Sequence, residues 1–94
     1  MIDAQEAYRI GLVNEVVKAA ELMGRAEAIL KQIAGNAPLS IRYALQAVNN
    51  GVETSLSEGL LLEASLVAIC TSTEDKKEGT SAFLEKRSAK FQGL

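Results

Sequence analysis

The sequence predicts an all-α fold of four or five short helices joined by short connections. Apolar residues recur at spacings of three and four through most of the chain, which is typical of helices that bury one face. Residues that favour helix ends, such as Asp, Ser, Thr, Gly and Pro, separate these runs. A length of 94 residues suits one small domain or a piece of a larger protein.

The first predicted helix lies between Asp3 and Gly11. Asp3 can accept the free backbone N–H groups of the first turn, and Glu6 completes the spacing of a capping box. Gly11 suits the left-handed conformation that ends many helices. Residues 12–17 are rich in β-branched side chains and break the helical period, so a short extended segment is an alternative to a loop there.

Two further helices are predicted over residues 20–34 and 38–50. For the second of these, Pro38 suits the first position of the helix and Gly51 suits its end. The apolar stripe of the first comprises Leu22, Met23, Ala26, Ile29, Leu30 and Ile33. We expect the second to bury Ile41, Ala44, Leu45 and Val48.

The fourth predicted helix begins at Ser55 or Ser57, ends near Thr71, and is apolar on nearly all sides. Because the other short helices cannot surround it, we expect part of its surface to meet another domain or subunit. Glu63 stands among its leucines. We expect it to pair with an Arg or Lys across a helix interface, for which Arg42 is a candidate, rather than to act as a base, since structural ion pairs are the commoner role of such a carboxylate.

The fifth predicted helix covers residues 72–85, capped by Ser72 or Thr73, with a bend or break expected at Gly79. The acidic cluster Glu74, Asp75 and Glu78 falls at its start. Paired carboxylates can bind a cation or transfer protons, but acidic residues also stabilise the positive end of a helix. We favour the structural interpretation.

Composition excludes several classes of site. The chain has no His and one Cys, so it contains no Ser-His-Asp triad, no His-containing zinc site and no internal disulfide. Cys70 is interpreted as a small core residue. The net charge of −2 argues against a nucleic-acid partner. No apolar run is long enough to span a membrane and no signal peptide is recognisable, so we expect a cytoplasmic protein.

Positive charge gathers only near the C-terminus. Lys86, Arg87 and Lys90, with Phe83 and Phe91, could clamp a nucleotide phosphate and stack its base. The alternative is a solvated helix end whose cations suit the helix dipole. Spacing alone favours the second interpretation.

Four passages, in order, resemble the enoyl-CoA hydratase/isomerase (crotonase) family. Residues 2–14, IDAQEAYRIGLVN, resemble its A-x-E-A-x-x-x-G-L-V-N passage, and residues 33–38, IAGNAP, its I-A-x-N-x-P junction. Residues 56–63, LSEGLLLE, are similar to its L-x-E-G-L-x-x-E helix. TEDKKEG at 73–79, AFLEKR at 82–87 and Phe91 resemble its C-terminal signature. Each passage alone is modest, but the ordered set is specific.

The resemblance implies that residues 1–94 form the C-terminal helical oligomerisation domain of such an enzyme. In the family this region packs on a catalytic core and builds trimers, often paired into hexamers. The oxyanion hole and catalytic glutamates lie upstream, so the resemblance assigns no catalytic residue and no metal here. It implies no cofactor, because the CoA thioester is the substrate. The segment alone is expected to be inactive and to self-associate.

Two CoA contacts are implied by the same resemblance. In some members the Phe of the A-F-x-E-K-R passage touches the adenine of a neighbouring subunit's CoA and the Lys touches a phosphate. These positions are Phe83 and Lys86. Arg87 has no such role in the pattern and is interpreted as structural.

The expected reaction of the parent is hydration of trans-2-enoyl-CoA to 3-hydroxyacyl-CoA in fatty-acid metabolism. Isomerases, dehalogenases and decarboxylases of the family share the helical region, so these reactions remain alternatives. The alternative from another class is a free-standing helical interaction domain without an acyl-CoA role.

Overall fold

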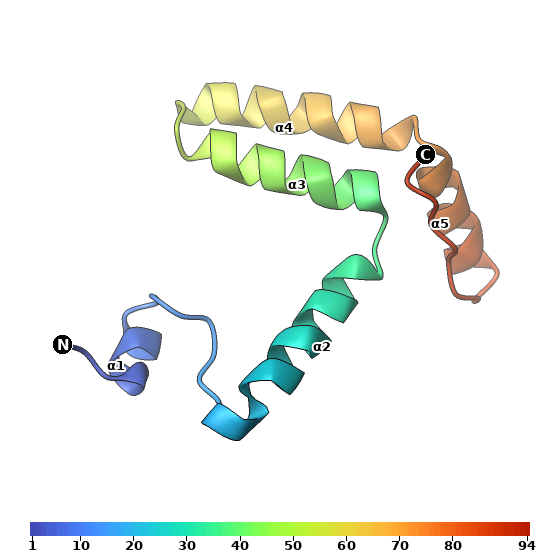
Figure 1. The fold of residues 1–94 in the computed structure, drawn as a ribbon. Coiled ribbons are helices and arrows are strands. Elements are labelled where there is room, and N and C mark those ends of the chain that lie inside the picture. The colour runs from blue at the N-terminus through green and yellow to red at the C-terminus, as the bar shows by residue number, and fades with distance from the viewer. The chain divides into compact units, whose positions relative to one another are not determined.

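The computed structural model describes all 94 residues and contains five α-helices, one short 3₁₀ helix (η1) and no strand (Figure 1). The predicted all-α class is therefore confirmed. The chain divides into two compact units, residues 1–32 and 33–94. No single helix is long and apolar enough to cross a membrane; α4 and α5 reach that length only together, across a bend of 74°.

The first unit begins with α1, Ala4–Arg9. The Asp3 carboxylate caps it by accepting the Glu6 N–H at 2.8 Å, as predicted. The Glu6 carboxylate, however, accepts two hydrogen bonds from the Arg9 guanidinium, at 2.6 and 2.7 Å. It therefore does not accept the Asp3 backbone N–H, which is the second hydrogen bond of a capping box. Gly11 ends the turn with φ of 76°.

The segment 12–17 is a loop rather than a strand. The backbone N–H groups of Leu12 and Val13 both donate to the Ala7 carbonyl, which turns the chain back toward α1. η1, Ala19–Glu21, then leads into α2, Leu22–Ala34. Arg25 holds the loop to α2 by donating to both Glu15 oxygens at 2.8 and 2.9 Å.

In the second unit, α3 (Pro38–Gly51) and α4 (Leu56–Thr71) run antiparallel, side by side (Figure 1). The predicted Pro38 start and the Ser55 cap, which accepts the Glu58 N–H at 3.3 Å, are both present. A side chain on Gly59 would place its Cβ 3.6 Å from the Gly51 Cα, so the helices approach closely near their connection.

α5, Glu74–Leu84, follows the Thr73 cap, whose hydroxyl accepts the Lys76 N–H at 3.1 Å. The break expected at Gly79 does not occur, because the helix continues through it. A Cβ there would lie 3.3 Å from the Phe91 ring, so the glycine makes room for the returning tail.

Apolar burial within the chain is sparse. The buried apolar residues are Ala7, Leu66 and Ala82. On α4, Leu61 is 69% exposed, which confirms that the other helices do not surround it. The burial expected for Ala44, Leu45 and Val48 on α3 is wrong, since all three are exposed, and the stripe on α2 is likewise largely uncovered. The exposed parts of these two apolar faces are not covered by other elements of this chain.

Candidate functional site

The C-terminal end of α5 brings together most of the residues singled out by the sequence. The helix closes with a Schellman motif, in which the Arg87 N–H donates to the Ala82 carbonyl at 3.0 Å and the Lys86 N–H to the Phe83 carbonyl at 3.3 Å. This motif needs a left-handed residue, and that residue is Lys86, with φ of 55°. It is the one non-glycine with positive φ in the chain.

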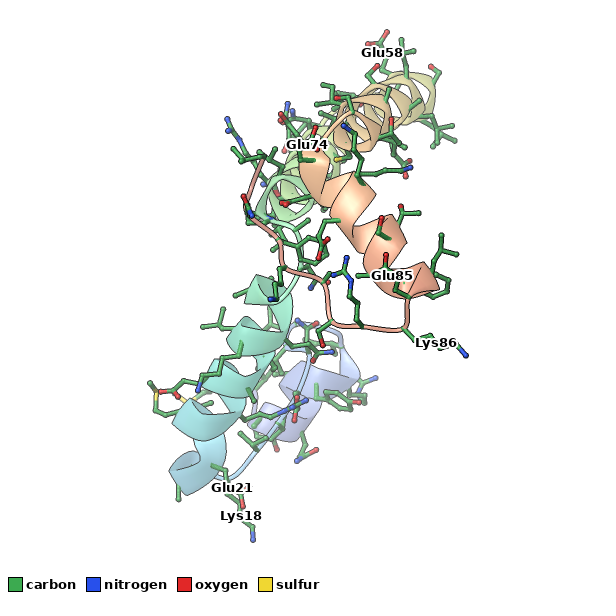
Figure 2. All side chains as sticks on the ribbon, turned by 90° about the vertical axis from the view of Figure 1, so that its right-hand side faces the viewer. Lys18, Glu21, Glu58, Glu74, Glu85 and Lys86 are labelled. Carbon is green, nitrogen blue, oxygen red and sulfur yellow. The ribbon has the colours of Figure 1, made fainter.

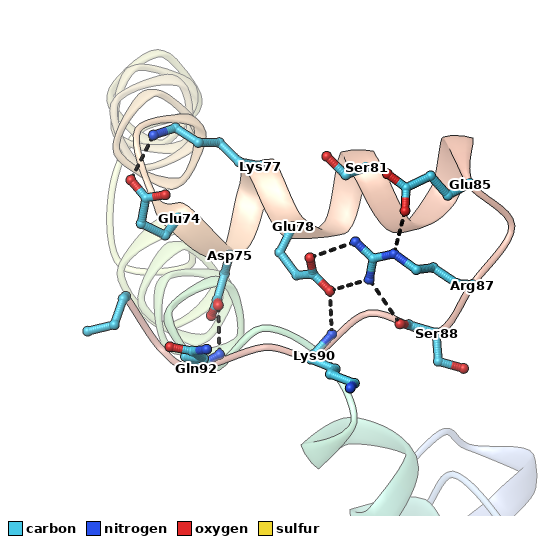
Figure 3. A pocket seen from close by; sticks show the side chains of 11 residues that line it. Glu74, Asp75, Lys77, Glu78, Ser81, Glu85, Arg87, Ser88, Lys90 and Gln92 are labelled. Atoms are coloured by element: carbon cyan, nitrogen blue, oxygen red, sulfur yellow. Dashed lines mark hydrogen bonds and ion pairs between the residues drawn. The ribbon is translucent and has the colours of Figure 1, made fainter.

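Arg87 is held by carboxylates. Its guanidinium donates to both oxygens of Glu78, at 2.6 and 2.9 Å, and to Glu85 at 2.6 Å (Figure 3). The Lys90 backbone N–H adds a 2.8 Å bond to Glu78. The Arg87 hydrogen bonds, followed by that of the Lys90 N–H, lower the pKa of Glu78 to about 2. The two carboxylates in turn raise the pKa of Arg87. The structural interpretation of Arg87 is therefore the correct one.

Asp75 holds the end of the tail. Its carboxylate is buried and accepts the Gln92 N–H at 2.7 Å and the Gly93 N–H at 2.8 Å, one on each oxygen. Its own N–H donates to the Leu94 carbonyl at 3.0 Å. The tail thus runs back along α5 toward the start of the helix (Figure 3).

The acidic cluster is structural, as predicted, but for a reason that the sequence did not indicate. Asp75 and Glu78 bind the tail, while Glu74 pairs with Lys77 at 2.7 Å. These residues line an open hollow of about 1,010 Å³ between α5 and the tail. Its carboxylates already have partners, and no group of three metal-ligating side chains occurs in the chain.

A second, more apolar hollow of about 680 Å³ lies among α3, α4 and α5. Phe91 and Cys70, both half-buried, line it, and Phe83 lies at the same hollow with 83% of its surface exposed. The two phenylalanines therefore differ. Phe91 packs against Gly79, whereas Phe83 is free to contact another molecule.

Lys86 is also free. Its side chain makes no hydrogen bond or ion pair within the chain and extends away from the end of α5 (Figure 2). The structure thus divides the predicted basic cluster. Arg87 and Phe91 bind the chain itself, whereas Phe83 and Lys86 are exposed. Lys90 binds Glu78 through its backbone N–H, and its side chain is exposed.

Two other outcomes concern residues outside this cluster. The expected pairing of Glu63 with Arg42 is wrong, since both side chains are exposed and no ion pair joins them. The role of Lys86 as the left-handed residue was missed. The signal was present, because no glycine follows α5 where its end requires one.

Comparison with known proteins places these features in a family. A sequence model of the enoyl-CoA hydratase/isomerase family matches residues 1–94. A crotonyl-CoA hydratase of Syntrophomonas wolfei is 42% identical over 97% of the chain, and a short-chain-enoyl-CoA hydratase of Clostridium acetobutylicum is 44% identical over 99%. The chain spans 35% of the length of each.

Solved structures agree. The crystal structure of an enoyl-CoA hydratase from Bacillus anthracis superposes with a TM-score of 0.96 at 39% sequence identity, covering 99% of this chain and 36% of that one. With the whole of its length matched in sequence and nearly all of it in structure, the chain belongs to the enoyl-CoA hydratase/isomerase family.

Proposed function

We propose that this chain is the helical part of an enoyl-CoA hydratase, which adds water to trans-2-enoyl-CoA to give 3-hydroxyacyl-CoA in fatty-acid metabolism in the cytoplasm. The observation that carries the proposal is the match of nearly the full chain to two relatives that are both named as hydratases of short enoyl-CoA or crotonyl-CoA substrates. Water addition itself is assigned to residues outside this chain, so residues 1–94 alone should not hydrate crotonyl-CoA.

The part of the chain proposed to contact CoA is the end of α5. Phe83 exposes most of its ring, which suits stacking on adenine. The ammonium of Lys86 has no partner in the chain and suits a phosphate oxygen. Both residues belong to one turn, joined by the hydrogen bond from the Lys86 N–H to the Phe83 carbonyl. One turn therefore offers both groups to the adenosine-phosphate portion of CoA.

The second proposed role is assembly with other copies through α4, as a trimer or hexamer of the parent. Leu56, Leu60, Leu61 and Val67 are 54 to 79% exposed on a helix that carries few polar residues. Covering such a surface is favourable at about 25 cal/mol per Å². Sedimentation of the chain should therefore show self-association that Leu61→Glu weakens; a stable monomer for the unsubstituted chain would contradict this role.

A hybrid enzyme tests the CoA contact. Residues 1–94 replace the 93 aligned residues of the C. acetobutylicum hydratase, and crotonyl-CoA hydration is followed. We expect turnover, with Lys86→Ala raising the KM by about 5- to 100-fold through loss of a charge-assisted hydrogen bond. Lys77→Ala is the matched control, because Lys77 lies on the same helix but already pairs with Glu74.

The control should leave the KM unchanged. A folded hybrid without turnover would contradict the hydratase assignment. A Lys86→Ala hybrid with the KM of the parent would remove Lys86 from the proposed contact and return it to the dipole interpretation.

A further inference from the structure

The same helix-ending motif occurs twice in this chain, with different residues at its left-handed position. At the end of α1, the Leu12 N–H donates to the Ala7 carbonyl at 2.9 Å and the Gly11 N–H to the Tyr8 carbonyl at 3.1 Å, with φ of 76° at Gly11. Glycine meets this requirement without strain. At the end of α5 the equivalent residue is Lys86, whose Cβ makes the conformation unfavourable.

The residues on either side of Lys86 are tied together. Glu85 precedes it, Arg87 follows it, and their side chains meet at 2.6 Å. Arg87 is further fixed by its two bonds to Glu78, which lies nine residues earlier in the chain, on α5. Lys86 therefore lies between two residues that are joined by an ion pair, while its own ammonium takes no part in these ion pairs.

Strained backbone of this kind persists only where the surroundings enforce it, and it is commonly found where a side chain must be presented in a particular direction. If the turn relaxed to negative φ, the direction of the Lys86 side chain relative to Phe83 would change. The ion pairs oppose that relaxation. Their effect is to fix the direction in which the Lys86 side chain leaves the backbone.

We propose that Glu78 and Arg87 are positioning residues that hold the turn carrying Lys86 and Phe83, so that the Lys86 side chain leaves this turn in the direction needed to reach a phosphate group of CoA. This rests on the proposed function of Phe83 and Lys86 as CoA contacts. The gain is one of preorganisation, since a turn that is already held in one conformation loses less backbone freedom when Lys86 binds phosphate.

The hybrid hydratase tests this with two substrates, crotonyl-CoA and crotonyl-pantetheine, which lacks the adenosine-phosphate portion. Glu78→Gln should raise the KM for crotonyl-CoA by about two- to tenfold, the range expected for one immobilised side chain, with little change in kcat. The KM for crotonyl-pantetheine should not change. Glu74→Gln, which removes an ion pair from the same helix without touching the tail, is the matched control and should alter neither.

A double substitution separates this proposal from the one on which it rests. If Glu78 acts through Lys86, the Glu78→Gln/Lys86→Ala enzyme should match Lys86→Ala alone. Additive effects, or an equal loss with both substrates, would overturn the positioning role. An unchanged KM in Lys86→Ala would instead overturn the CoA contact itself.

The 94-residue chain gives a second measurement that needs no hybrid. The left-handed conformation of Lys86 can be read by NMR from its Cα chemical shift and its amide–Hα coupling. Glu78→Gln should average these values while Glu74→Gln preserves them. Values unchanged in Glu78→Gln would show that the ion pair does not hold the turn, and the proposal would be wrong.

Discussion

The C-terminal ends of α1 and α5 have the same pattern of backbone hydrogen bonds, but they differ in which residue adopts the left-handed conformation and in what holds it there. At α1 a glycine adopts the left-handed conformation, and no atom beyond its two chain neighbours lies within 4 Å of where its Cβ would be. At α5 a lysine adopts it, and ion pairs and a bound tail surround that turn. The first end needs only a residue without a Cβ, whereas the second depends on groups far along the chain.

The difference shows that the left-handed position of a helix end can be occupied by a residue with a side chain, provided that other contacts hold the turn. Lys86 keeps an exposed ammonium that glycine could not supply. The contacts that hold it come from Glu78, and Asp75 secures the tail beyond. Changes to either end, or to these supports, can test the comparison.

The largest effect is expected from Asp75→Asn, which weakens the support of the α5 end. The carboxylate accepts one N–H on each oxygen, whereas an amide offers one acceptor and points donor hydrogens at the other N–H. Loss of one charge-assisted bond, with a part-buried N–H left unpaired, should lower the stability of the tail by about 1.5 to 3 kcal/mol. Amide exchange at Gln92 and Gly93 measures this.

Glu74→Gln is the control for that experiment. Glu74 is adjacent in sequence but exposed, and its pair with Lys77 should contribute less than about 1 kcal/mol. Equal exchange rates in Asp75→Asn and the unsubstituted chain would show that the tail is held by other contacts.

The next effect is expected at the α1 end. Gly11→Ala adds a Cβ where the space is open, so the cost arises from the left-handed backbone alone. We expect a loss of about 1 kcal/mol, since the strain of 1 to 2 kcal/mol is partly offset by the lower entropy of the unfolded chain. Faster exchange of the Leu12 amide would report it. An unchanged rate would mean that φ at this position can relax freely.

The predictable part of the fold was the part determined by neighbours in sequence. Asp3, Gly11, Pro38 and Thr73 act within a few residues, so the helix starts and the α1 end followed from local chemistry. The exposed, unpartnered state of Phe83 and Lys86 is consistent with the site that the family resemblance indicated.

The tail could not be predicted in the same way. Its contacts join Asp75 to residues 17 and 18 positions later, and residues 88–94 carry no periodic pattern. The buried face of α3 was also misjudged, because periodicity shows that a face is apolar but not whether this chain supplies its cover. Glu63 was expected to be buried among leucines and therefore to need a partner, but this face of α4 is uncovered and the Glu63 side chain is exposed.

Lys86→Gly should have a smaller effect, opposite in sign to Gly11→Ala. Removing the Cβ relieves the left-handed strain, and the greater entropy of unfolded glycine offsets part of the gain, which leaves about 0.5 to 1 kcal/mol of added stability. Exchange of the Arg87 amide should slow accordingly. In the hybrid hydratase the same substitution should raise the KM for crotonyl-CoA as Lys86→Ala does. If Lys86→Gly is no more stable than the unsubstituted chain, the left-handed backbone at Lys86 is not strained.

The smallest effect is expected from acid, because the Glu78–Arg87 pair is partly exposed and screened by solvent. Its hydrogen bonds lower the pKa of Glu78 from 4.5 to about 2. A carboxylate with a lowered pKa stabilises the folded turn fully above the unfolded value, and this contribution is lost as the pH falls from about 4.5 through 2.

The carboxyl carbon of Glu78 should therefore titrate near pH 2, and the left-handed signature of Lys86 should weaken over the same range. In Glu78→Gln the Lys86 signature should already be averaged at neutral pH and should show no step from this site. Gly11 is the internal reference, because its conformation needs no ion pair to hold it. A Glu78 midpoint near 4.5 would show that the pair does not persist in solution, and the two helix ends would then differ in sequence but not in how they are held.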